Sequence, residues 1–338
     1  MKKKLSLIVP ALSTDPYIED IIVNILNWTI LPSQIVIVNS SDKDYRIEND
    51  LKKRLKKKKI KLTMINKKNL FPGAARNAGI LKSSNEYIAF LDVNTLPYSR
   101  DWLKINFDYM IKNNLDGIFG KTYYSTNSYI ENIIRASTYG KAYLRTIPGS
   151  IFKRKLVLSS VGVFNSESRA GEDTDWLKRV QKTNLKTADC KIPVYYKGLY
   201  NSTFSSIIKK WIRNYFYSEN LPHLTAQKNF YLFFLFFIGF LFVFNWNYSS
   251  LCILNSECIK QTNKIIVIPH VTKIFLFLSV MIYTIARGVY LPLKKKIKLN
   301  FIFPINFLLI TIFSFILDLV KTMTFLSLSF LKILRLIK

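Results

Sequence analysis

The sequence predicts an α/β domain followed by hydrophobic, membrane-associated helices, and two observations carry this prediction. Up to about residue 228, short β-branched runs alternate with stretches of helical periodicity, which is the pattern of a parallel α/β sheet. Beyond that point the apolar residues come in long blocks. We therefore predict a soluble domain over residues 1–203, an interfacial amphipathic linker over 204–228 and a membrane domain over 229–338.

The elements of the soluble domain can be taken in chain order. The predicted strands cover residues 5–9, 34–38, 60–65, 87–91 and 116–119. The predicted helices between them cover residues 17–28, 74–82 and 101–113. In such sheets ligands bind outside the carboxyl ends of the strands. The residues that follow positions 9, 38 and 91 are therefore candidates for a binding site.

Three hydrophobic segments follow the soluble domain. A helix needs about 20 predominantly apolar residues to cross a bilayer, and residues 229–250 meet this requirement without a single charged side chain. We predict a second span over residues 274–293. The third block, residues 301–331, is interrupted by Asp318 and Lys321. Both a third span and a long interfacial helix fit this block.

The formal net charge of +29 makes polyanions candidate partners: nucleic acid, anionic lipids and phosphate-bearing substrates. The densest basic run, residues 52–59, has no interleaved aromatic residue and no recognition motif beside it, so we expect no nucleic-acid partner. We expect the surplus charge to meet membrane lipids. The basic residues 294–298 favour a soluble domain that faces the cytoplasm from the cytoplasmic membrane. Three cysteines are too few for a disulfide framework.

The first motif with chemical content ends the strand at residues 87–91. Asp92 and Asn94 are two positions apart, so they can point to the same side of the chain. There they could hold Mg²⁺ or Mn²⁺ between protein oxygens and a diphosphate. The alternative interpretation is an aspartate that caps a strand before a turn.

The second motif is the small-residue segment 71–79. A helix that starts near Gly73 directs its N-terminal amides and its positive dipole end outwards. Arg76 adds a planar cation suited to phosphate or ribose contacts. A tightly packed helix start with a structural arginine is the alternative.

The third motif is the acidic segment 171–176, with three carboxylates at a predicted helix start. The helix dipole alone would explain them. A positioned carboxylate could also take the proton from an attacking hydroxyl group. Trp176 beside it could offer a flat face to a sugar ring.

Taken in this order, the motifs resemble those of glycosyltransferase family 2 over roughly residues 4 to 200. The segments that carry the resemblance are LSLIVP (5–10), IVIVNSS (35–41), GAARNAG (73–79), FLDVN (90–94) and GEDTD (171–175). The resemblance implies a GT-A fold, a Rossmann-like domain that binds a nucleoside-diphosphate sugar and inverts the anomeric carbon.

The resemblance also implies roles for individual residues. Pro10 and Asn39 match the nucleobase pocket, Arg76 and Asn77 the nucleotide contacts, Asp92 and Asn94 the metal motif, Asp173 the general base, and Gly149 and Ser150 the turn beside the acceptor. We also expect Glu172 and Trp176 on the acceptor side.

The sequence departs from the family pattern at three places. Asn39 and Ser40 stand where many members have two aspartates, which leaves the nucleotide open. Asn94 replaces the second acid of the metal motif and predicts weaker metal affinity. Residues 209–213 lack the Gln-x-x-Arg-Trp pattern of processive synthases, which predicts the addition of one sugar or a few.

These observations predict a metal-dependent, inverting glycosyltransferase that acts at the membrane on a lipid-linked or other glycan acceptor in cell-envelope polysaccharide or glycoconjugate synthesis. Two alternatives stay open. One is a polyprenyl-phosphate sugar synthase. The other is a non-catalytic membrane scaffold with a degenerate transferase domain, suggested by Asn39, Ser40 and Asn94.

Overall fold

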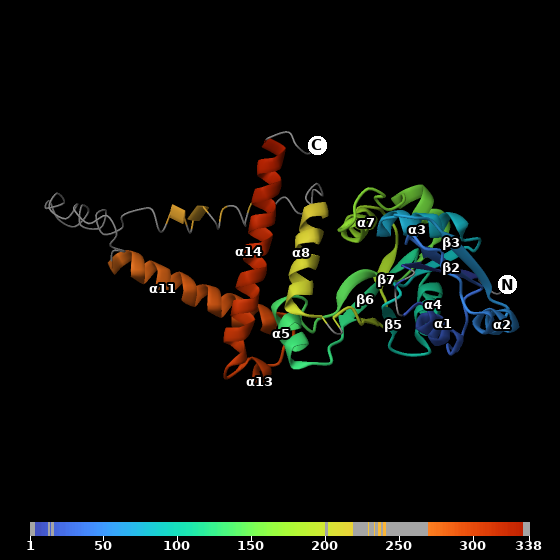
Figure 1. Ribbon diagram of the computed structural model, residues 1–338. Coiled ribbons are helices and arrows are strands. Elements are labelled where there is room, and N and C mark those ends of the chain that lie inside the picture. Colours follow the sequence, from blue (N-terminus) through green and yellow to red (C-terminus); the bar gives the residue numbers. More distant parts are fainter. Residues whose placement is uncertain are drawn as a thin grey trace. The chain divides into compact units, whose positions relative to one another are not determined.

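The computed structural model describes residues 4–12, 14, 17–199, 202–218, 270–333 and single positions between 229 and 240 (Figure 1). The chain forms two compact units, which we describe separately. The first comprises Met1–Glu131 and Lys141–Thr203, and the second Asn132–Gly140 and Phe204–Lys338. The predicted span at residues 229–250 falls largely outside the described residues.

The first unit is built on a mixed nine-stranded sheet, with the order β3-β2-β1-β4-β7-β6-β9-β5 and β8 paired to β6. The strands are β1 Leu5–Ala11, β2 Gln34–Asn39, β3 Lys61–Asn66, β4 Tyr87–Phe90, β5 Thr95–Pro97, β6 Gly117–Tyr124, β7 Leu144–Lys153, β8 Thr187–Asp189 and β9 Val194–Tyr196. The first four strands are parallel, as predicted. Strand β7 runs antiparallel to β4 and β6, and β5 runs antiparallel to β9, so the sheet is mixed and not wholly parallel. The predicted α/β, Rossmann-like fold class is confirmed.

Helices cover both faces of this sheet. They are α1 Ile18–Leu26, α2 Asn49–Lys57, α3 Pro72–Lys82, α4 Trp102–Lys112, the short α6 Arg154–Leu156 with the π-helical turn η1 Val157–Val161, and α7 Glu172–Gln181. Successive strand residues point to opposite faces. Leu7 therefore joins the core under α1, α2 and α4, whereas Ile8 joins the core that contains Ile80 of α3 and Trp176 of α7.

Two glycines let α3 lie close to its neighbours. A Cβ atom at Gly79 would lie 2.4 Å from Cγ2 of Ile8 in β1, and one at Gly73 would lie 2.1 Å from the carbonyl oxygen of Asn165. Any larger side chain would push the helix away from β1 and from the loop that leads to α7. The small residues of the second motif thus hold α3 between β1 and this loop.

The second unit is helical. It contains most of α5 Tyr129–Ser137, and then α8 Phe204–Ser218, α11 His270–Thr284, the π-helical turn η3 Ile285–Tyr290, α12 Leu291–Lys294, α13 Leu299–Ile302 and α14 Asn306–Ile333. Residues 132–140 belong here although they lie between two strands of the first unit. Ile133 and Ala136 pack with Ile297, Ile302 and Ile310.

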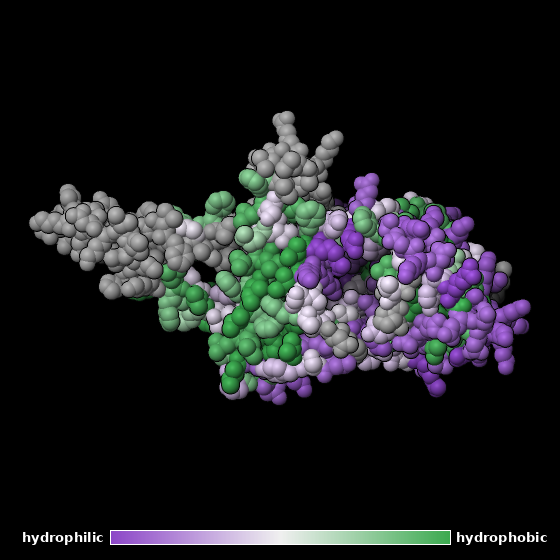
Figure 2. Space-filling view, viewed as in Figure 1, coloured by the Kyte–Doolittle hydropathy of each residue, from purple (hydrophilic) through white to green (hydrophobic). Residues whose placement is uncertain are grey.

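Two stretches in this unit are long and apolar enough to cross a membrane, Leu276–Lys294 and Asn306–Leu328. They overlap the predicted span at 274–293 and the undecided block at 301–331. Figure 2 shows apolar side chains gathered over α14. Large apolar residues such as Phe277 and Ile312 are exposed there.

Helix α8 packs on α14 within the second unit. The ring centroids of Tyr215 and Phe325 lie 5.1 Å apart, and those of Phe204 and Phe313 lie 4.3 Å apart. The predicted interfacial linker therefore begins as a helix with an apolar partner. Its remaining residues, 219–228, lie outside the described part of the chain.

Candidate active site

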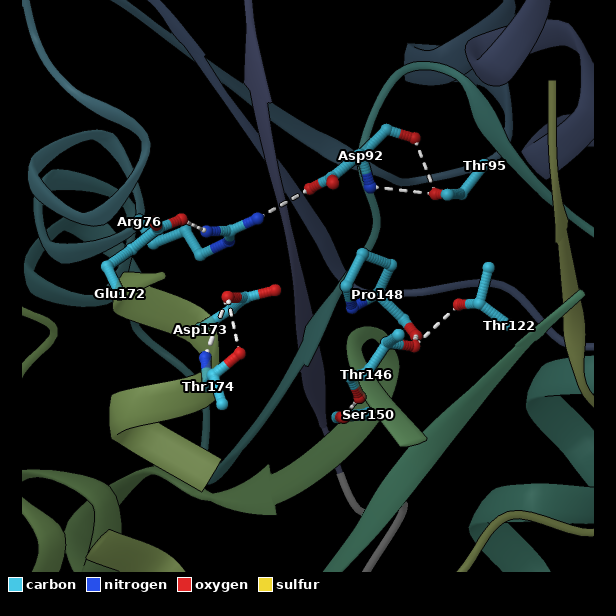
Figure 3. Close-up of polar contacts among 10 residues, drawn as sticks. All are labelled: Arg76, Asp92, Thr95, Thr122, Thr146, Pro148, Ser150, Glu172, Asp173 and Thr174. Carbon is cyan, nitrogen blue, oxygen red and sulfur yellow. Dashed lines mark hydrogen bonds and ion pairs between the residues drawn. The ribbon is translucent and has the colours of Figure 1, made fainter. Parts of the chain in front are cut away.

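Arg76 links two of the other predicted motifs (Figure 3). Its Nη1 lies 2.8 Å from Oε1 of Glu172, and its Nη2 lies 3.0 Å from Oδ1 of Asp92. Asp92 follows β4, and Glu172 is the first residue of α7. The Arg76 side chain is only 5% exposed and lies over the ring of Phe164, 5.6 Å from its centroid. The arginine is therefore a buried bridge between a strand end and a helix start.

Local backbone geometry presents the two acidic partners. The backbone amide of Asp92 donates to Oγ1 of Thr95 at 2.9 Å, and the threonine hydroxyl donates to the carbonyl oxygen of Asp92 at 2.7 Å. This closes a turn directly after β4. Gly171 has a φ of 84°, a left-handed conformation that favours glycine. The chain can therefore turn sharply into α7.

Asp173 lies next to Glu172 in the first turn of α7 and is half-buried. Its Oδ1 accepts hydrogen bonds from the backbone amide of Thr174 at 2.7 Å and from the Thr174 hydroxyl at 3.3 Å. Figure 3 shows its other oxygen pointing away from Thr174, on the side of the site where Pro148 lies. The positive end of the helix dipole stabilises a carboxylate here.

Burial and charge act together on this cluster. Burial raises the pKa of Glu172 to about 7, while Arg76 opposes the rise and Asp173 adds to it. Burial alone lowers the pKa of Arg76, but Asp92, Glu172 and Asp173 more than offset this and hold it above its ordinary value. Arg76 is thus always charged, and three carboxyl groups surround one cation. The cluster carries excess negative charge whenever its acids are ionised.

The residues assigned to the nucleobase pocket lie at neighbouring strand ends, since Ala11 and Asn39 are in register and Pro10 precedes Ala11. The Asn39 side chain is fully buried. Its Nδ2 donates to the carbonyl oxygen of Lys43 at 2.8 Å and to Oδ1 of Asn66 at 2.9 Å. This side chain holds the turn after β2, and its assignment to the nucleobase pocket stays a prediction.

Asn77 also has a role that the sequence did not indicate. Its Nδ2 donates to the carbonyl oxygen of Phe164 at 2.8 Å and to the hydroxyl of Ser166 at 3.1 Å, and its Oδ1 accepts from the amide of Phe164 at 2.8 Å. Its assignment to the nucleotide contacts stays a prediction. Asn77 joins α3 to the loop before α7 and so helps to hold α3, which carries Arg76, in place.

The predicted acceptor side needs three corrections. Trp176 is fully buried, its indole donates to the carbonyl oxygen of Gly162 at 2.9 Å, and its ring stacks on Phe164. It offers no face to a sugar, because Glu172, Trp176 and Val180 follow one another at helical spacing on the buried side of α7. Glu172 itself is buried as a partner of Arg76.

The third correction concerns the turn in β7. The Ser150 hydroxyl is buried, accepts from the amide of Gly120 and donates to the carbonyl oxygen of Thr146, each at 2.8 Å. It therefore braces the strand and is not open to an acceptor. Gly149 has a φ of 86°, so the small residue expected here meets a backbone requirement.

The donor set for a divalent cation can be tested on Asp92 and Asn94. The Asp92 side chain is 27% exposed and uses Oδ1 for Arg76, and Asn94 is half-buried in the same turn. Carboxylate and amide oxygens suit Mg²⁺ or Mn²⁺, so the residues fit. Within the described ranges no three His, Cys, Asp or Glu side chains gather as a metal site. Substrate oxygens and water would have to complete the coordination.

The sequence analysis did not identify Thr95 and Phe164. Thr95 bonds to the backbone of Asp92, and the ring of Phe164 lies against Arg76. Thr95 follows the metal motif directly, and a hydroxyl group at this position could have indicated a hydrogen bond to the backbone of the motif. Phe164 comes from a loop far along the chain, and no local pattern marks it.

The chain is similar to known glycosyltransferases. The family model described as Glycosyl transferase family 2 matches residues 6–168. An uncharacterized glycosyltransferase of Rickettsia bellii is 29% identical over 193 residues, which are 54% of this chain and 27% of that protein. One of Haemophilus influenzae is 27% identical over 245 residues, 69% of this chain and 94% of that protein. The chain thus spans less than a third of the length of the Rickettsia bellii relative.

Solved structures also align with the chain. Residues 1–349 of S. aureus TarS in complex with UDP-GlcNAc give a TM-score of 0.44 at 15% identity, covering 65% of this chain and 67% of that chain. The mannosyltransferase PcManGT from Pyrobaculum calidifontis, in complex with GDP-Man and Mn²⁺, gives 0.49 at 12% identity, covering 96% and 88%.

Proposed function

The N-terminal unit of this chain belongs to glycosyltransferase family 2, and on that premise we propose that it transfers a sugar from a nucleoside-diphosphate sugar to a hydroxyl group of a lipid-linked acceptor. The observation that carries the proposal is the Arg76 bridge. It joins the end of β4 to the start of α7 and leaves Asp173 beside the pair with one oxygen directed away from its own helix.

In the proposed step, Asp173 accepts the proton of the acceptor hydroxyl as that oxygen attacks the anomeric carbon. The new carbon–oxygen bond forms on the face opposite the diphosphate, whose bond to the same carbon breaks, so the configuration inverts. The nucleoside diphosphate leaves with the electron pair. Orientation of the two substrates supplies much of the rate, and the buried, multiply bonded Arg76 keeps the flanking carboxylates in place.

The donor would bind along the ends of β1, β2 and β4, where Pro10 and Asp92 lie. Asp92 and Asn94 are the residues that would hold a divalent cation, and such an ion would offset the charge of the leaving diphosphate. Arg76 is committed to Asp92 and Glu172, so we assign it to holding these acids in position.

The two apolar stretches of the second unit support a membrane location. We place the protein in the cytoplasmic membrane with the first unit facing the cytoplasm, because the basic residues 294–298 follow the first of these stretches. An active site attached to a bilayer favours an acceptor carried on lipid. Such a transferase would serve in the synthesis of cell-envelope glycans.

The test uses the full-length protein in detergent with a panel of nucleotide sugars and Mn²⁺. Asp173→Asn should reduce transfer by about 10²–10⁴-fold, with donor affinity nearly unchanged. Asp175→Asn is the matched control, because Asp175 lies on the same helix but pairs with Arg179 at 3.0 Å. It should keep most of the activity.

Substantial turnover by Asp173→Asn would overturn the assignment of the base. If that turnover occurred on a lipid phosphate, which needs no strong base, it would favour a polyprenyl-phosphate sugar synthase. Failure of the folded wild-type protein to bind any nucleotide sugar would favour the non-catalytic scaffold.

A further inference from the structure

Lys197 follows strand β9 and lies beside the metal motif. Tyr196, the last residue of β9, is in register with Thr95, whose hydroxyl closes the turn at Asp92. The next residue is Lys197, and its backbone amide donates to the carbonyl oxygen of Asn94 at 2.9 Å. The chain therefore attaches Lys197 directly to the turn that holds Asp92 and Asn94.

The side chain of Lys197 extends from this turn to the connection between β1 and α1. Its Nζ lies 5.2 Å from the ring centroid of Tyr17, the residue that directly precedes α1. Pro10, which we assign to the nucleobase pocket, lies near the end of β1, where the same connection begins. Lys197 thus extends from the metal motif toward the strand end where the donor would bind.

The ammonium group of Lys197 can accept a further partner. Lys197 is half-buried, and no carboxylate in the described part of the chain forms an ion pair with it. A contact with the face of an aromatic ring is weak near the surface and leaves the three N–H donors of an ammonium group unused. Arg76, by contrast, is bonded to both Asp92 and Glu172. Lys197 is therefore a cation beside the metal motif that can bind an incoming anion.

A nucleoside-diphosphate sugar would bring two negative phosphate groups to a site that already holds several acids. Asp92, Glu172 and Asp173 surround Arg76. Asn94 contributes a neutral amide oxygen and so attracts a divalent cation less strongly than a carboxylate would. More negative charge collects on the diphosphate when its bond to the sugar breaks, and a positioned cation stabilises such charge.

We propose that Lys197 binds the diphosphate group of the donor and stabilises it as it leaves the sugar. The ammonium group donates charge-assisted hydrogen bonds to the phosphate oxygens. It acts together with any divalent ion that Asp92 and Asn94 hold. The inference rests on the proposed sugar transfer, to which it adds a substrate-binding residue, and not on the membrane location.

The test measures the affinity of the full-length protein in detergent and Mn²⁺ for ADP, GDP, UDP and dTDP and for the matching monophosphates. Lys197→Gln should weaken binding of the preferred diphosphate about tenfold, the effect of losing one hydrogen bond to a charged group. Binding of its monophosphate should change much less. The temperature of thermal unfolding should stay close to that of the wild type, because only a surface contact with a ring is lost.

Lys191→Gln is the matched control. Lys191 lies before β9, whereas Lys197 lies after it, and the Nζ of Lys191 also contacts a tyrosine, 4.3 Å from the ring centroid of Tyr109. Lys191 is exposed. This variant should bind the diphosphate like the wild type.

Three results would overturn the inference. Equal losses in Lys197→Gln and Lys191→Gln would indicate a diffuse charge effect. Equal losses for the diphosphate and the monophosphate, together with a lower unfolding temperature, would indicate a structural role for Lys197. Unchanged diphosphate binding by Lys197→Gln, beside a wild type that binds, would contradict this inference alone. A folded wild type that binds none of the four diphosphates would contradict the proposed function, and this inference with it.

Discussion

The two units each contain a buried charge cluster, and the clusters are opposite in sign. In the first unit one cation, Arg76, is bonded to Asp92 and Glu172. In the second unit one anion, Asp318, is bonded to Arg287 and Lys321. The central group is therefore a cation in the first cluster and an anion in the second.

In each cluster the central residue joins its outer partners, which come from different parts of the chain or from different turns of one helix. A central residue that pairs with two residues of the opposite charge is held in position by both. Each outer group is held chiefly through its pair with the centre. Removing the centre should therefore do more damage than removing any outer residue.

The largest effect is expected when the centre of the first cluster is removed. Arg76→Ala would leave Glu172 and Asp92 as neighbouring carboxyl groups without their cation, and breaking a buried pair in this way costs about 3–5 kcal/mol. The free energy of unfolding, measured with urea on the full-length protein, should fall by that amount. Arg179→Lys is a suitable control, since its pair with Asp175 is about one-third exposed. Equal losses in both variants would contradict the central role of Arg76.

A smaller effect on the free energy of unfolding is expected over the pH range in which Glu172, an outer acid of the first cluster, titrates. The pKa of Glu172 is raised to about 7 from its ordinary 4.5, chiefly by burial. The folded state therefore holds this proton more tightly than the unfolded state does, and stability should fall as the pH rises from about 4.5 to about 7, by at most about 3 kcal/mol. Glu172→Gln should flatten this part of the stability profile. An unchanged profile would show that another group causes the fall.

The third effect concerns what the negative cluster attracts. Asn94→Asp adds a carboxylate to the metal motif and should lower the Mn²⁺ concentration needed for half-maximal donor binding, by about tenfold for about 1.4 kcal/mol of added attraction. Asp92→Asn should raise it. Isothermal titration of the donor at a series of Mn²⁺ concentrations measures both. Opposite shifts in the two variants are required, and shifts in the same direction would place the ion elsewhere.

The strands and the acids of the site could be predicted because their signals are local. Apolar runs marked the strands, and Asp92 and Asp173 stand directly after a strand and at a helix start. Trp176 was misassigned although its position four residues after Glu172 already indicated a shared helix face. The direction of β7 and the membership of residues 132–140 in the second unit depend on tertiary packing, which no local pattern reveals.

The contacts of other polar side chains could not be predicted, because their partners are distant in sequence. Asn77 bonds to Phe164, and Ser150 bonds to Gly120. Each polar residue looked available because the groups that satisfy it lie many residues away. The same reasoning explains why the Arg76 bridge was not foreseen, since Glu172 lies far from it along the chain.

The smallest effect on stability is expected at Asp189, an exposed acid that, like Asp318, pairs with two cations. In the first unit Asp189 lies 2.6 Å from Arg145 and 3.5 Å from Lys121, so one acid again meets two cations, but its side chain is 33% exposed. Water and salt screen such pairs, and Asp189→Asn should cost less than about 1 kcal/mol. Thermal unfolding at low and high salt measures this, and the small difference should vanish at high salt. A loss as large as that of Arg76→Ala would mean that the arrangement of charges matters more than their burial, which would remove the basis for treating the two buried clusters as special sites.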